Sequence, residues 1–361
     1  MDFISHNIAN ISVFLSTKDM FNLAYCCRYF YWYLFNSGTN MLNHCFTVKK
    51  TILNLEFINK LPYKIFNINL NANKYLKDDD FVYLFNIYSL DMSNCNQETI
   101  TDKAFEHLRN LRILNMQFCN QITITDKAFE HLKCLHILNM GNCNQITITD
   151  KAFENFKNIH TLDMNHCYQH SITDKAFKYL KNICSLDMRD CYQNTITDKA
   201  FKYFKNVKYL DISFCNQNTI TDLAFTNLRN VYYLNISRCN QNTITDQAFV
   251  NFKCIHHLDM SFCKQSTITD KAFQYLKDIS ILNMSKCNQT TITDKAFTYL
   301  GNLNTLNMSS CNQKTITDKA FQHLSNISIL NISHCNQKTI TSKALEYIKH
   351  INHLEKKNFG H

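Results

Sequence analysis

One motif fills most of the chain, and residues 111–134 give a typical copy of it, LRILNMQFCNQITITDKAFEHLKC. Its cysteine has counterparts at steps of 24 residues, without a single insertion. The eleven members of this column are Cys95, Cys119, Cys143, Cys167, Cys191, Cys215, Cys239, Cys263, Cys287, Cys311 and Cys335. A fixed period of this kind indicates stacked structural units, none of which can bury its apolar edge alone.

Each copy predicts one short strand followed by one short helix. Residues 113–118 alternate between apolar and polar side chains, which is typical of a strand. Thr125 and Asp126 then supply a helix start, with an oxygen for unpaired N–H groups and a negative charge at the positive end of the helix dipole. The side chains expected to face the core are Leu114 and Met116 in the strand and Ala128, Phe129 and Leu132 in the helix.

The spacing of Leu111, Leu114, Met116 and Cys119 is L-x-x-L-x-L-x-x-C, and it resembles the cysteine-containing class of leucine-rich repeats. The resemblance implies an α/β fold: a leucine-rich-repeat solenoid shaped as a horseshoe. Its parallel strands line the concave face and its helices line the convex face.

The array has irregular ends, as repeat arrays require. A degenerate copy begins at Ile65 and continues through Ile68, Leu70 and Asn73, and Ile351 and Leu354 begin one more turn near the C-terminus. We therefore predict a solenoid over residues 65–361, a connecting segment over 46–64 and a separate helical module over 1–45.

Composition excludes several classes of protein. The four glycines lie far apart, so neither a dinucleotide-binding loop nor a P-loop can be written with them. The chain has no run of 18 apolar residues that could span a membrane. Its first residues match a signal peptide poorly, because Asp2, and no Lys or Arg, precedes the apolar residues. We expect an intracellular, cytoplasmic protein with reduced thiols and no membrane contact. The net charge of +9 permits an anionic partner but does not demand one.

The cysteine column has a structural interpretation. A small buried thiol that donates to a loop carbonyl, once per repeat, explains the period. No C-x-x-C pair is present to hold zinc, so we predict neither a metal nor a cofactor. The glutamines from Gln97 to Gln337 form a second column, interpreted as an amide ladder that satisfies the loop backbone. Without a glycine loop, a metal spacing or a nucleophile motif, no catalytic residue is predicted and an enzyme is not expected.

Residues 1–45 do not repeat. Their pattern of Ser16, Asp19, Cys27, Arg28 and Phe30 resembles an F-box, although the usual Pro and Glu near its start are missing. The residues expected to contact an adaptor are Phe3, Ile4, Ile8, Ile11, Leu15, Leu23, Cys27, Arg28 and Trp32. A helical cap for the solenoid is the alternative interpretation.

The resemblance implies an adaptor function. F-box helices dock on a Skp-type subunit, and through it on a cullin, in a Skp–cullin–F-box ubiquitin ligase, while the repeats bind a protein substrate. The chain would then be a monomer apart from that complex. A leucine-rich-repeat scaffold or a decoy that never assembles a ligase would have the same sequence features.

Comparison of the repeats predicts where a substrate binds. Variable strand-side positions carry aromatic, Arg and charged residues of the kinds that dominate protein interfaces. They are Phe118, Arg189, Asp190, Tyr209, Phe214, Tyr233, Arg238, His257 and Phe262. Neutral drift of exposed positions is the alternative. On the helix side, lysines alternate with Asp and Glu, which favours a solvated surface over nucleic-acid binding.

Overall fold

The structure, a computed structural model, describes residues 45–47 and 67–357. The chain divides into two compact units, Met1–Asn158 and Ile159–His361. All nine residues of the F-box prediction lie outside the described residues, so that prediction stays a prediction.

The described residues of the first unit contain five parallel strands that follow one another in chain order. The strands are β1 (Cys45–Thr47), β2 (Asn67–Asn69), β3 (Ser89–Asp91), β4 (Ile113–Asn115) and β5 (Ile137–Asn139). The helices are η2 (Asp78–Leu84), α5 (Asp102–Phe105), η3 (Asp126–His131) and η4 (Ala152–Asn155). The degenerate first repeat is confirmed by β2 and η2, whereas β1 was not predicted.

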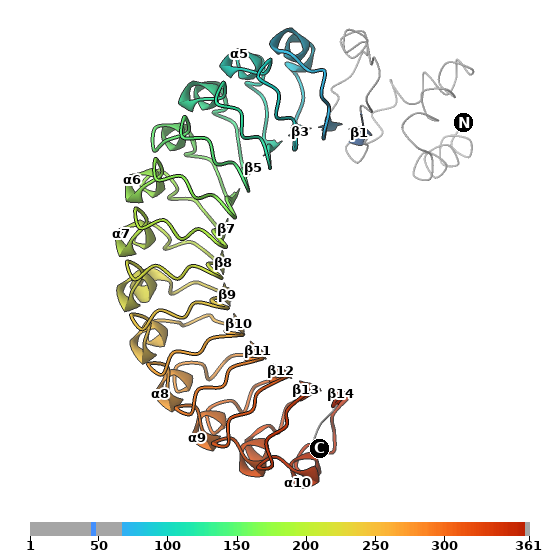
Figure 1. Ribbon diagram of the computed structural model, residues 1–361, viewed down its shortest axis with the longest axis vertical. Coiled ribbons are helices and arrows are strands. Elements are labelled where there is room, and N and C mark those ends of the chain that lie inside the picture. The colour runs from blue at the N-terminus through green and yellow to red at the C-terminus, as the bar shows by residue number, and fades with distance from the viewer. Residues whose placement is uncertain (1–44, 48–66, 358–361) are drawn as a thin grey trace, which may run out of the picture. The chain divides into compact units, whose positions relative to one another are not determined.

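The second unit repeats the same arrangement, with its strands along one side and its helices along the opposite side (Figure 1). Its strands are β6 (Thr161–Asp163), β7 (Ser185–Asp187), β8 (Tyr209–Asp211), β9 (Tyr233–Asn235), β10 (His257–Asp259), β11 (Ile281–Asn283), β12 (Thr305–Asn307), β13 (Ile329–Asn331) and β14 (His353–Glu355). Its helices are α6 (Asp174–Phe177), α7 (Asp198–Phe201), η5 (Asp222–Asn227), η6 (Asp246–Phe249), α8 (Asp270–Phe273), α9 (Asp294–Phe297), η7 (Asp318–His323) and α10 (Ser342–Glu346).

Each strand is shorter than the alternation of its sequence predicts. The expected strand 113–118 ends at Asn115, because the chain turns immediately after Met116. The N–H of Cys119 donates to the carbonyl of Met116 at 3.1 Å, and Phe118 adopts a left-handed backbone with φ 60°. The middle residue of the strand, Leu114, is completely buried, so the inward direction of the predicted positions is correct.

The helices begin where the Thr-Asp pair predicts and end after one or two turns. Thr197 is the N-cap of α7, and its hydroxyl accepts from the N–H of Lys199 at 3.2 Å. The following aspartate does more than complement the helix dipole. Asp198 accepts from the N–H of Thr221 and from its hydroxyl, both at 2.7 Å, and Thr221 is the N-cap of the next helix. The same pair of bonds ties most neighbouring repeats together.

The core is a stack of similar layers, and the burial of all eleven column cysteines confirms the structural interpretation of that column. Cys215 and Cys239 are fully buried, and their thiols donate to the carbonyls of Met188 and Ile212 at 3.2 and 3.0 Å. Burial raises the pKa of Cys215 to about 12. Phenylalanine rings fill the helix side of most layers.

The column glutamines from Gln121 to Gln337 are buried, and their hydrogen bonds follow the predicted amide ladder only in part. Gln121 and Gln217 donate to the carbonyls of Cys95 and Cys191, both at 3.0 Å. The amide of Gln241 is as deeply buried, yet it has no hydrogen-bond partner among the described residues.

Within the residues that the structure describes, no helix is long and apolar enough to cross a membrane.

Candidate binding surface

An aromatic row crosses three adjacent strands of the second unit. Tyr209, Tyr233 and His257 begin β8, β9 and β10 and lie in register. The two tyrosine rings stack with centroids 4.1 Å apart and planes 4° apart, and His257 meets Tyr233 edge-on at 4.5 Å. Because Leu210 beside them fills the core, the alternation of the strand turns these rings outward, and Tyr209 is 41% exposed.

The aromatic row has the electrostatics of a partly desolvated surface. Burial raises the pKa of Tyr233, and its hydrogen bond with Tyr209 raises it further. Burial also lowers the pKa of His257, so the ring is held toward its neutral form. The stack therefore presents flat aromatic faces, with the charged forms of Tyr233 and His257 disfavoured, which suits contact with a flat or apolar group of a partner.

A second row follows the turn just beyond the strands. Phe214, Arg238, Phe262 and Lys286 occupy successive repeats and alternate aromatic with cation. The Arg238 guanidinium carbon lies 4.9 Å from the centre of the Phe214 ring and 3.9 Å from that of Phe262. The Lys286 ammonium lies 4.6 Å from Phe262. Such cation–π contacts hold the four side chains in an extended ridge.

This ridge stands on an unfavourable backbone. All four residues have φ between 57° and 62°, the left-handed region that side chains with a Cβ avoid. The equivalent positions in two repeats of the first unit hold Asn94 and Asn142, a residue type that tolerates this conformation best. Large rings at such a position cost stability and remain exposed, Phe214 by 39%.

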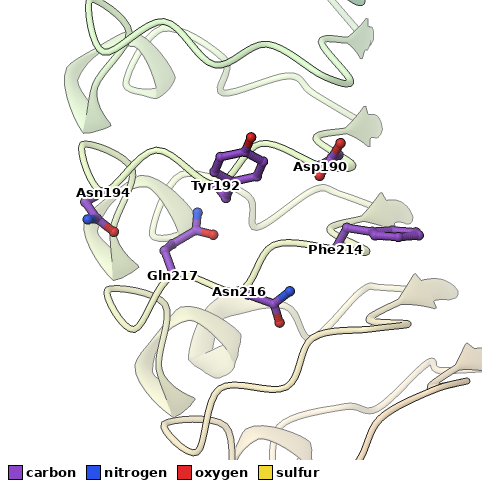
Figure 2. A pocket seen from close by; sticks show the side chains of 6 residues that line it. All are labelled: Asp190, Tyr192, Asn194, Phe214, Asn216 and Gln217. Carbon is purple, nitrogen blue, oxygen red and sulfur yellow. The ribbon is translucent and has the colours of Figure 1, made fainter.

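A shallow pocket of about 440 Å³ adjoins the ridge (Figure 2). Its walls come from two consecutive repeats, and the amide of Gln217 points toward the loop that carries Tyr192. The lining residues are Asp190, Tyr192, Asn194, Phe214, Asn216 and Gln217. The pocket thus combines two aromatic rings, three amides and one carboxylate.

The pocket lies where a regular feature of the loops is interrupted. Elsewhere the residue after each column cysteine is mostly asparagine, whose side chain accepts from the N–H of its counterpart in the next repeat. Asn240 donates in this way to Asn216 at 2.7 Å. Tyr168 and Tyr192 replace asparagine in two successive repeats, and their rings lie 5.0 Å apart. A tyrosine ring cannot provide the same carbonyl oxygen, so the ladder is broken here.

The pocket carboxylate is held in place by two neighbours. Asp190 accepts from the Tyr168 hydroxyl at 2.9 Å, and His166 Nδ1 lies 2.7 Å from the same oxygen. Burial and this bond to Asp190 raise the pKa of Tyr168. A carboxylate has about four acceptor positions, so these contacts leave capacity for a further donor.

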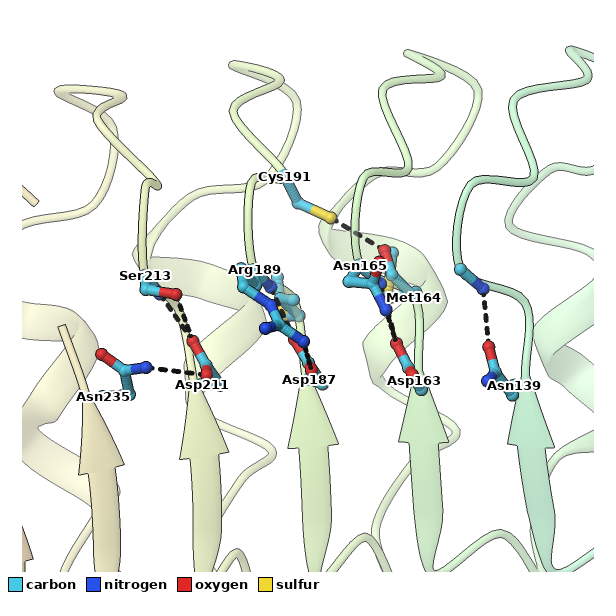
Figure 3. A network of polar contacts seen from close by, with 12 residues as sticks. Asn139, Asp163, Met164, Asn165, Asp187, Arg189, Cys191, Asp211, Ser213 and Asn235 are labelled. Carbon is cyan, nitrogen blue, oxygen red and sulfur yellow. Dashed lines mark hydrogen bonds and ion pairs between the residues drawn. The ribbon is translucent and has the colours of Figure 1, made fainter. Parts of the chain in front are cut away.

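Three aspartates stand in register on the strands beside the pocket, Asp163, Asp187 and Asp211 on β6, β7 and β8 (Figure 3). Burial raises the pKa of Asp187, and the other two carboxylates raise it further against the opposing effect of Arg189. The Arg189 guanidinium donates to Asp187 at 2.8 Å. This part of the strand face therefore has a negative potential.

Most of the substrate-binding residues predicted from the sequence meet in the second unit. Tyr209, Tyr233 and His257 form the aromatic row. Phe214, Arg238 and Phe262 belong to the ridge. Asp190 reaches the pocket, but Arg189 pairs with Asp187 instead of joining either row. Phe118 lies in the first unit, 44% exposed at the same turn position as the ridge. That a substrate binds them remains untested.

Tyr168 and Tyr192 were not predicted, because they lie on the loops and the prediction was drawn from strand-side positions. The available signal was their replacement of asparagine after the column cysteine. Within residues 45–47 and 67–357, no group of three His, Cys, Asp or Glu side chains is placed so that it could hold a metal ion.

Comparison with known families identifies the repeated unit. The family described as leucine rich repeat matches residues 85–146 and 205–265, and the BspA-type leucine rich repeat region matches residues 242–358. The repeats are leucine-rich repeats. Among curated proteins no sequence match is found.

Among solved structures with the same fold, this leucine-rich-repeat chain spans only about half the length of the chains it matches. A chain of the TLR13–ssRNA13 complex aligns with a TM-score of 0.60 and 18% identity over 85% of this chain and 49% of its own length. Two structures of the Drosophila Toll–Spatzle complex align with TM-scores of 0.63 and 0.62, at 19% and 14% identity. The first alignment covers 83% of this chain and 42% of the matched chain, and the second covers 86% of this chain and 49% of the matched chain. At such identity the likeness concerns the fold alone.

Proposed function

We propose that the chain is a non-catalytic protein-binding module whose recognition surface is the strand face of β8–β10 with the adjoining ridge. The exposed stack of Tyr209 on Tyr233 carries the proposal. Two tyrosines in the outward row of a sheet add little to the core, whereas aromatic residues and arginine dominate protein interfaces. Arg238 beside them is of the same interface type. The Toll structures, solved in complex with Spatzle, are consistent with protein binding by this fold.

The finer form of the proposal rests on sequence alone. The resemblance of residues 1–45 to an F-box supports a substrate-recognition adaptor, with the repeats holding a protein destined for ubiquitination. A scaffold or decoy is the alternative, and it needs the same binding surface. The two forms differ only in whether a Skp-type subunit binds the N-terminal module.

The binding surface is tested by replacing Tyr209, Tyr233 and Arg238 together with Ser, which other repeats carry at the equivalent positions as Ser89, Ser185 and Ser310. Partners are captured with the tagged full chain from a eukaryotic host and quantified by mass spectrometry. Interface anchors contribute about 2 kcal/mol or more each, so the triple variant should lose most of the captured partner. Its melting temperature should fall only slightly, since a ring pair of this kind contributes about 0.5–1.5 kcal/mol.

The matched control replaces three exposed helix-side residues, Lys199, Lys202 and Leu223, with Ser. It should keep the full set of partners. Partner capture that is equal for both triple variants would place the binding surface elsewhere.

The adaptor form is tested separately with the double variant Ile11→Asp and Leu15→Asp. These residues match F-box positions, and two carboxylates on an apolar helix face oppose docking. We expect the variant to lose a co-purifying Skp-type subunit and cullin while the repeats keep their melting temperature. Capture of those subunits by the variant, or by a chain lacking residues 1–45, would leave the scaffold form.

A further inference from the structure

We infer that the pocket between Asp190 and Phe214 receives an arginine side chain of the protein partner. The inference deepens the proposed function by naming the group that the surface recognises. It rests on the chemistry of the pocket wall, on the position of Phe214 within the ridge, and on two substitutions that the fold itself disfavours.

The wall matches the donors and the plane of a guanidinium. Gln217 is 5% exposed, its Nε2 donates to the carbonyl of Cys191 at 3.0 Å, and its Oε1 has no hydrogen-bond partner among the described residues. The same oxygen is unpaired and shielded from solvent in the other column glutamines, so it belongs to the fold, and recognition is left to Asp190 and the two rings. The Asp190 carboxylate favours a ligand with a positive charge and N–H donors, and Tyr192, 52% exposed, offers a ring face. Arginine combines a planar cation with five donors.

The ridge shows a guanidinium already bound in this manner. Arg238 lies against Phe214 from the next repeat, at 4.9 Å. Asp190 belongs to the preceding repeat, so it flanks Phe214 on the opposite side. A partner arginine placed there would have a carboxylate on one side and a ring on the other, which continues the alternation of aromatic and cationic groups along the ridge.

Two features of the pocket are poor solutions for the fold alone. Asparagine in place of Tyr192 would restore the ladder bond to the backbone of Asn216, as Asn216 does for Asn240. Asparagine in place of Phe214 would suit its φ of 62° better. Both departures instead place rings at the mouth of one pocket, which is expected of a site that stacks a ligand.

The charge around the pocket favours a cationic side chain over a nucleobase, the other flat group with hydrogen-bonding edges. Asp190 lines the pocket, and its carboxylate would repel the phosphates of a nucleic acid. A lysine would satisfy the charge, but its point-like ammonium lacks the plane that Tyr192 and Phe214 can stack.

The experiment titrates the full chain with the peptide acetyl-Gly-Gly-Arg-Gly-Gly-amide, followed by saturation-transfer NMR. Peptides with citrulline or lysine in place of arginine serve as ligand controls, because citrulline keeps the plane without the charge and lysine keeps the charge without the plane. We expect the arginine peptide to bind at least tenfold more tightly than either. The variants Y192N and D190N should each weaken it tenfold or more.

Both substitutions introduce residues that the repeats already use at these positions, so the variants should fold with an unchanged melting temperature. The matched control K264N alters the same loop position outside the pocket and should bind as the original chain does. Equal binding of the arginine and citrulline peptides, no binding of either, or full binding by Y192N would overturn the inference.

A single-stranded oligothymidylate provides the competing test. If it binds, and Y192N abolishes that binding while the arginine peptide fails to bind, the pocket holds a base and the inference is wrong. The proposed function is judged separately, by the triple variant of the aromatic row. A chain that keeps its protein partner through that row but ignores the arginine peptide would sink the inference and leave the function standing.

Discussion

Removing the carboxylate of Asp198 should uncouple two neighbouring repeats. Asp198 begins α7, and it accepts two hydrogen bonds from Thr221, the N-cap of η5. Both are short, at 2.7 Å, and both end on a charged acceptor. In the variant Asp198→Ala the N–H and the hydroxyl of Thr221 lose these partners.

The size of the effect follows from those two bonds. A hydrogen bond to a charged group contributes about 1.5–3 kcal/mol when buried, and Asp198 is only half-buried. Partial exposure lowers this contribution to about 1–1.5 kcal/mol for each bond, so the two bonds together give a loss of about 2–3 kcal/mol in the free energy of unfolding. For a cooperative unit of this size that corresponds to roughly 4–12 °C in melting temperature.

Circular dichroism during heating, together with urea titration, measures the loss. The control Lys199→Ala changes the next residue on the same turn, whose exposed side chain should contribute less than about 0.5 kcal/mol. A double-mutant cycle with Thr221→Val isolates the contact itself. Equal losses for Asp198→Ala and the control, or strictly additive effects in the cycle, would refute the reasoning.

Three further predictions concern single residues. In the native protein at pH 8, exposed Cys134 and Cys254 should react with iodoacetamide far faster than Cys215, whose pKa burial raises to about 12; peptide mapping measures each rate. Asp187→Asn should stabilise the protein at pH 7 and not at pH 3. The pKa of Asp187 is raised in the folded state, so its neutral form favours folding, and that stability is lost as pH rises through the folded pKa. Urea titrations measure the effect, and a gain in stability at both pH values would contradict the assignment. Phe214→Asn should leave stability unchanged or raise it by up to about 1 kcal/mol, since relief of the left-handed backbone offsets the lost contact with Arg238; a clear drop in melting temperature would show that the ring is a structural part.

The layers of the core could be predicted from one copy of the motif, because every copy faces the same packing requirement. The inward direction of Leu114 and Met116, the cap at Thr125 and the burial of the column cysteines all follow from side-chain spacing. The early end of each strand could not be predicted in this way. It results from a left-handed turn, and residues such as Phe118 at that turn give no local signal for it.

Two other features lay beyond the repeat pattern. The strand β1 lacks the leucine spacing of the repeats and is defined by its pairing with β2, a contact between segments 22 residues apart. The bond from Asp198 to Thr221 links residues of different repeats, so a helix-start motif read within one repeat explains the aspartate only as a cap. Both are consequences of stacking, which appears only when the units are assembled.

The candidate site was predictable to the extent that departures from the repeat were noticed. An exposed position that drifts freely accumulates small polar residues as readily as rings. Here the departures run against local preference: tyrosine replaces a ladder asparagine at Tyr192, and phenylalanine occupies a left-handed turn at Phe214. Both line one pocket, and the row of Tyr209 and Tyr233 lies on the strands that follow it. Asparagine occurs at both positions in other repeats, so two rings that meet at one pocket are explained by a contact that the isolated chain does not make.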